Sequence, residues 1–229
     1  MSRRVAIALS CACFAGGAAH ADALQDQVVA IARATRTDTY SFRRTIVVES
    51  NLVARKVVEE QFDPHRPAGD QWVLLSIDAR APTPKEAADA YKARRDPFPP
   101  YPAVAKWFGG PAVRSETAPG YATYRFASLW PGTLKFGSHD ASPDTQAEVL
   151  VNMKSNVPFI ERIDMTSTKP FSMMLVASMR GMTFTMRYRQ LADGNIVPLD
   201  AVSDITGSAM GKAGQAHTSA TFSDFQPAQ

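Results

Sequence analysis

The fold of this chain is decided by residues 170–225, PFSMMLVASMRGMTFTMRYRQLADGNIVPLDAVSDITGSAMGKAGQAHTSATFSDF. Apolar and polar residues alternate through three runs of this segment, a period-two pattern typical of strands that turn one face to an apolar surface. Phe184, Met186 and Tyr188, for example, fall on the same face. Asp193-Gly194 predicts a tight hairpin between two of the runs. The segment therefore predicts consecutive antiparallel strands with a shared apolar face.

The first residues have the layout of a secretory signal peptide. Arg3 and Arg4 precede the apolar run 5–15, and small residues lead to Ala21. We expect a signal peptide over residues 1–21 and one domain over residues 22–229, located in the periplasm. No later window reaches the roughly 20 apolar residues that a membrane-spanning helix needs, so we expect no transmembrane span.

Composition and motifs argue against several function classes. Both cysteines lie before residue 21, which excludes disulfides and thiol chemistry from the mature chain. The formal net charge is +3 without a basic stripe, so we expect no nucleic-acid partner. The run 207–212 is too short for a phosphate-binding loop and lacks its Ser or Thr. Ser138-His139-Asp140 cannot form a catalytic relay, because neighbours in sequence do not meet in line. We predict no enzymatic activity and no cofactor.

Upstream of residue 170 the sequence predicts further strands and a few helices. Residues 22–36 have the apolar spacing of an amphipathic helix, and Thr83-Pro84-Lys85-Glu86 is a capping box that begins a second one. The run 96–102 holds four prolines and should be a stiff extended arm. With roughly nine to eleven strands and two or three helices, the predicted fold is mainly β (α+β). It is a curved antiparallel sheet whose concave face is covered by helices.

Methionines are concentrated in the segment that decides the fold, and three interpretations are open. Met173, Met174, Met179, Met182 and Met186 could fill an ordinary core, because methionine adapts to irregular apolar gaps. They could instead line a cavity for variable acyl chains. Thioether sulfur also binds Cu(I), which makes a copper carrier the third interpretation. Core filling and cavity lining rank close together, and copper ranks well behind.

A family resemblance joins these features. The signal peptide, the opening helix, the run Tyr40–Ile46 (YSFRRTI), the long antiparallel sheet and the late Asp-Gly hairpin resemble periplasmic lipoprotein carriers of the LolA and LolB type and the related sensor RseB. The resemblance implies an open half-barrel that is lidded by helices and holds acyl chains. No arginine here can be matched to the one that grips lipoproteins in those carriers.

The resemblance also implies positions for a ligand site. The lid would comprise the helix from Pro84 together with Phe98, Tyr101 and Trp107. The concave wall would comprise Trp72, Leu175, Met179, Phe184 and Met186. Leu74 and Met182 complete the set of residues predicted to bind the ligand.

The leading hypothesis is a monomeric periplasmic binding protein, not an enzyme, that holds an acyl chain or lipid-like ligand for transport of outer-membrane lipids or lipoproteins. The alternative is a structural or regulatory protein of the cell envelope that binds a protein partner at an open sheet edge and has a filled core.

Overall fold

The computed structural model describes residues 22–36, 39–67, 69–92, 100–136, 138–174 and 177–228. The predicted signal peptide lies outside these residues, as do two of the predicted site residues, Phe98 and Leu175.

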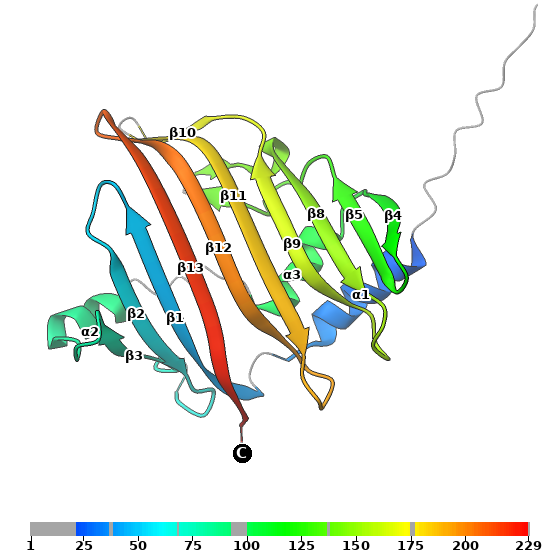
Figure 1. The fold of residues 1–229 in the computed structure, drawn as a ribbon, viewed down its shortest axis with the longest axis horizontal. Coiled ribbons are helices and arrows are strands. Elements are labelled where there is room, and N and C mark those ends of the chain that lie inside the picture. The colour runs from blue at the N-terminus through cyan, green and yellow to red at the C-terminus, as the bar shows by residue number, and fades with distance from the viewer. Residues whose placement is uncertain are drawn as a thin grey trace, which may run out of the picture.

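One large antiparallel sheet makes up most of the described structure (Figure 1). Its strand order is β3-β2-β1-β13-β12-β11-β9-β8-β5-β4, and β10 pairs with β11 beside this path, so that eleven strands are joined. The bounds are β1 Tyr40–Ser50, β2 Lys56–Phe62, β3 Trp72–Ile77, β4 Val113–Ala118, β5 Tyr121–Phe126, β8 Thr145–Asn152, β9 Phe159–Ser167, β10 Phe171–Met174, β11 Ala177–Gln190, β12 Ile196–Ala209 and β13 Lys212–Pro227. A separate short pair consists of β6 Lys135–Phe136 and β7 His139–Asp140. The predicted mainly β, curved antiparallel sheet is confirmed.

Residues 170–225 form the centre of the sheet, as their alternation predicts. They contain β10, β11 and β12 and nearly all of β13, the last three being 14, 14 and 16 residues long. Gly194 has φ +90 in the hairpin between β11 and β12. The last strand, β13, pairs with β1, so the final strand of the chain lies beside the first one in the sheet.

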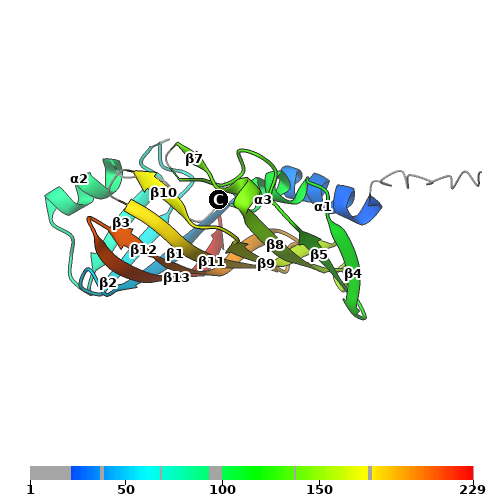
Figure 2. The ribbon, with the colours of Figure 1, turned by 90° about the horizontal axis from the view of Figure 1, so that it is seen from above.

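Three α-helices are described, α1 Ala23–Ala34, α2 Pro84–Lys92 and α3 Tyr101–Phe108, and all lie on the concave side of the sheet (Figure 2). Asp22 caps α1 by accepting hydrogen bonds from the backbone N–H groups of Leu24 and Gln25. The side-chain amide of Gln25 donates to the carbonyl of Phe108, 2.5 Å away, which joins α1 to the end of α3.

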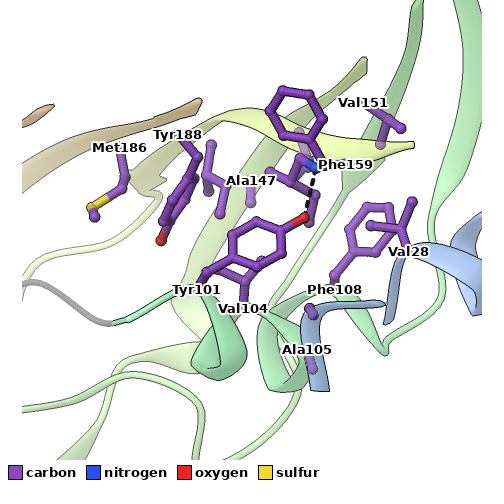
Figure 3. Packing of buried hydrophobic residues seen from close by; sticks show 14 of the residues in the cluster. Val28, Tyr101, Val104, Ala105, Phe108, Ala147, Val151, Phe159, Met186 and Tyr188 are labelled. Carbon is purple, nitrogen blue, oxygen red and sulfur yellow. Dashed lines mark hydrogen bonds between the residues drawn. The ribbon is translucent and has the colours of Figure 1, made fainter. Parts of the chain in front are cut away.

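Helices α1 and α3 cover the main hydrophobic core (Figure 3). Val28 of α1 and Val104 of α3 are fully buried, together with Ile160 and Ile163 of β9. Tyr101 begins α3 and is 1% exposed. Its hydroxyl accepts a hydrogen bond of 2.9 Å from the backbone N–H of Ile160, which fixes α3 on β9. The core therefore fills the space under these two helices.

Helix α2 has the predicted cap but a different position. The carboxylate of Glu86 accepts hydrogen bonds from the backbone N–H and hydroxyl of Thr83, and it pairs with Arg80 at 2.6 Å. These contacts hold the pKa of Glu86 far below its usual range, chiefly through the hydrogen bond with Arg80. The helix lies beside the edge strand β3, away from α1 and α3 (Figure 1), and residues 84–90 include no fully buried one. It does not lid the core.

Strand β3 also differs from the expectation drawn from its sequence. Both of its faces are apolar, which predicts cover on both sides, but the strand lies at the edge of the sheet and only Ile77 is fully buried.

No helix in the described part of the chain is long and apolar enough to cross a membrane.

Candidate functional site

A pocket of about 240 Å³ opens at one end of the concave face. It lies where β1 and β12 begin and β2 and β13 end, beside the first turn of α3. Seven aromatic residues line it: Tyr40, Phe42, Phe62, Trp72, Tyr101, Phe222 and Phe225. Arg36, Thr39 and Gln71 add polar groups to its lining. Such a composition, mostly apolar with a few polar groups, is typical of small-molecule sites.

Strand register brings these rings together around Phe42. Phe42 of β1 lies opposite Phe62 of β2, which in turn lies opposite Trp72 of β3. The centroid of the Phe42 ring is 5.2 Å from that of Phe62, 5.5 Å from Trp72 and 5.4 Å from Phe225. These separations are those of favourable aromatic pairs, so the pocket wall is a connected layer of rings.

A bulge in β13 places Phe225 in this layer. Phe222 and Phe225 are three residues apart, so simple alternation would put them on opposite faces. Asp224 has φ +54, and the pairing of β1 with β13 shifts register between Ser41 and Arg43. The irregularity turns Phe225 to the side of Phe222, and both pack near Phe42.

Two tyrosines of the pocket are fixed by hydrogen bonds. The Tyr40 hydroxyl donates to the carboxylate of Asp193 in the hairpin between β11 and β12. This bond raises the pKa of Tyr40 and lowers that of Asp193. Burial raises the pKa of Tyr101 well above its usual range. Both phenols therefore stay protonated at neutral pH and shape the pocket as uncharged groups.

A buried ion pair continues the concave wall beyond the aromatic pocket. Arg44 of β1 and Glu60 of β2 are direct cross-strand partners, and Nη2 of Arg44 lies 2.7 Å from Oε2 of Glu60. The Arg44 side chain is 6% exposed and that of Glu60 18%. The guanidinium also stacks over the ring of Trp72, with Cζ 4.0 Å from the centroid. The wall thus combines an aromatic end with one neutralised pair of charges.

The structure brings only some of the predicted site residues together. Trp72 and Tyr101 line the aromatic pocket. Leu74 is half-buried on β3, opposite Glu60. Trp107 and Phe184 are partly buried against the main core, with ring centroids 6.5 Å apart.

The predicted methionines lie in closed clusters. Met186 is fully buried in the main core. Met179 and Met182 are 2% and 5% exposed in a second cluster with Phe171 and Ala141. None of the three lines the aromatic pocket. Their positions favour the core-filling interpretation of these side chains, and a copper role stays a prediction.

Sequence reasoning missed Arg44, Glu60 and most of the aromatic layer. A signal for the ion pair is present in two charged doublets, Arg43-Arg44 and Glu59-Glu60. Because neighbouring residues of a strand point to opposite faces, one member of each doublet must face the concave side.

Within the described residues, no three or more His, Cys, Asp or Glu side chains come together in a way that could hold a metal ion.

Comparisons with known proteins give one similar structure. No family model matches the chain, and no curated protein matches it. Among solved structures, the chain is similar to the crystal structure of the LolA superfamily protein NE2245 from Nitrosomonas europaea. The sequence identity is 13% and the TM-score 0.36, and the match covers 90% of this chain and 92% of that chain.

Proposed function

We propose that the protein is a periplasmic binding protein, not an enzyme, that holds an apolar, lipid-like ligand in the aromatic pocket. The observation that carries the proposal is a pocket of about 240 Å³ walled by seven aromatic residues on the concave side of an open sheet. Burial of an acyl chain against such a wall gains about 0.8 kcal/mol per methylene. Among the three described helices, only α3 contributes a residue, Tyr101, to the lining of this pocket.

The volume limits what the pocket takes. It lies slightly below the roughly 300–1,000 Å³ of sites that hold a whole drug-sized molecule. A segment of one acyl chain fits this size better than a complete lipid with two chains. The head group of such a ligand would remain near Arg36, Thr39 and Gln71, the polar members of the lining.

A displacement assay with a fluorescent fatty acid tests the proposal. Trp72→Ala removes one wall of the pocket and should weaken binding at least about tenfold, since a large ring no longer covers the chain. Trp130→Ala is the matched control, because Trp130 is 55% exposed and does not line the pocket. Native mass spectrometry of the protein from its own periplasm should show a bound lipid mass. Absence of both a co-purified lipid and any displacement would contradict the proposal.

The second candidate function is binding of a protein partner at the sheet edge. All six residues of β4 are exposed, and β4 ends the sheet on the side opposite β3. An extended segment of a partner could add a strand there. Glu116 lies opposite Ala122, whose main-chain groups face β8, so the backbone N–H of Glu116 points to the free edge. Glu116→Pro would remove this donor and should abolish such binding while leaving the fatty-acid assay unchanged.

A further inference from the structure

Large apolar side chains are exposed at two neighbouring hairpin tips. Leu52 and Val53, in the loop between β1 and β2, are 43% and 62% exposed, and Met210, in the turn between β12 and β13, is 83% exposed. Asn51 joins the two hairpins, since its side-chain oxygen accepts from the backbone N–H of Gln215 at 2.8 Å. These three apolar residues are called the apolar tips. They lie at the end of the sheet opposite the aromatic pocket (Figure 1).

Met210 occupies a position that favours other residues. Its φ is +51 and that of Gly211 is +78, so both central residues of the turn are left-handed. Asn-Gly is the preferred pair for such a turn, because asparagine and glycine adopt positive φ at lower cost than methionine. Methionine here costs conformational free energy and exposes apolar surface to water. Neither the positive φ of Met210 nor the exposure of its side chain stabilises the fold. The residue therefore points to a contact outside the chain.

Positive charge accompanies the apolar tips. Lys56 begins β2 and Lys212 begins β13, and both are exposed. Neither lysine forms an ion pair with a described residue, whereas Arg55 is neutralised by Glu49 at 3.1 Å. Exposed apolar residues flanked by lysine are the composition of segments that bind anionic bilayers: the apolar groups enter the boundary of head groups and acyl chains, and the lysines contact the head groups.

We propose that the apolar tips dock the protein reversibly on an anionic membrane surface. Leu52, Val53 and Met210 insert, and Lys56 and Lys212 pair with lipid phosphates. With so small an apolar area the docking is weak, and each lysine contributes about fivefold to the affinity at low salt. The aromatic pocket stays at the far end of the sheet, so the docking neither needs nor blocks it.

Co-sedimentation with vesicles tests the docking. The wild type should bind phosphatidylcholine vesicles that contain phosphatidylglycerol, and should bind pure phosphatidylcholine much less. The triple variant Leu52→Ser, Val53→Ser, Met210→Asn should bind at least about tenfold more weakly. A variant with Lys56→Gln and Lys212→Gln should lose most of the dependence on phosphatidylglycerol and on salt.

Met210→Asn alone separates docking from folding. Asparagine suits the left-handed turn, so the melting temperature should stay equal or rise while vesicle binding falls several-fold. Val113→Ser is the control, because Val113 is 72% exposed on β4 and lies outside the tips. Equal binding of the triple variant and the wild type, or no wild-type binding to phosphatidylglycerol vesicles, would overturn the docking. Binding of an acidic protein without vesicle binding would also overturn it. The fatty-acid displacement assay is expected to be unchanged in all these variants.

Discussion

Tyr101→Phe should lower stability at neutral pH by an amount that vanishes in alkali. The substitution keeps the ring, which packs 5.0 Å from Tyr188 between ring centroids, and removes only the hydroxyl. The backbone N–H of Ile160, a fully buried residue, then loses the acceptor that lies 2.9 Å away. A buried donor without a partner costs about 1–3 kcal/mol. We expect a loss of that size in the free energy of unfolding.

The pH dependence follows from the raised pKa of Tyr101. The ordinary tyrosine pKa of 10.0 applies to the unfolded chain, and burial raises the pKa of Tyr101 in the folded state. Above pH 10 the unfolded phenol loses its proton while the folded one keeps it, so the wild type loses stability as the pH rises. The loss is about 1.4 kcal/mol per pH unit for this one group. Phenylalanine has no such loss, and the two stabilities should become equal near pH 11 to 12, about one to two units above the unfolded pKa.

Urea unfolding followed by circular dichroism, repeated from neutral pH to alkaline pH, measures both effects. All other titrating groups are common to the two proteins and cancel in the difference. A difference in stability that stays constant with pH would refute the argument, because it would mean that the Tyr101 phenol titrates alike in both states. A variant as stable as the wild type at neutral pH would refute the role of the hydrogen bond.

Three further predictions concern the interior of the sheet. Met186→Ala should cost about 2–5 kcal/mol in urea unfolding, because the side chain is fully buried, and should leave ligand affinity per folded molecule unchanged. Arg44→Leu should cost about 3–5 kcal/mol by leaving Glu60 buried without its partner, and adding Glu60→Leu should restore most of that stability. Gly207→Ala should cost at least about 1–3 kcal/mol, since the new methyl group would point directly at the backbone carbonyl of Ser178; a melting temperature equal to that of the wild type would contradict this.

The large elements of the fold could be predicted because their signals are local. Alternation predicted β11 and β12, and Asp193-Gly194 predicted the hairpin between them. The capping box at Thr83 predicted the start of α2. The place of α2 could not be predicted from the same residues, because its position depends on which strand is at the sheet edge. That order follows from the pairing of β1 with β13, at opposite ends of the described chain.

The aromatic pocket depends on irregularities that alternation does not contain. Phe222 and Phe225 share a face only because of the bulge at Asp224 in β13, which also shifts the register of β13 against β1 beside Phe42. The prediction that Met179, Met182 and Met186 line the ligand site differs from the pocket found in the structure for a related reason. Their number suggested an apolar surplus available to a ligand, but a buried position and a cavity wall require the same alternation. Only the helices placed over Met186 decide that it belongs to the closed core.

The two charged doublets, Arg43-Arg44 and Glu59-Glu60, each place one residue on the outer face of the sheet and one on its concave face. Arg43 and Glu59 point outward, where Arg43 lies 3.8 Å from Asp224 and Glu59 accepts a hydrogen bond from Ser76. Arg44 and Glu60 must then point inward, and their register makes each the partner of the other. An apolar chain that extended from Phe42 along β1 toward the tips would meet this pair after one step of two residues. Because contact with a paired charge gains less than contact with a ring, the pair sets an inner limit on the apolar site, in keeping with a pocket that holds a segment of one chain.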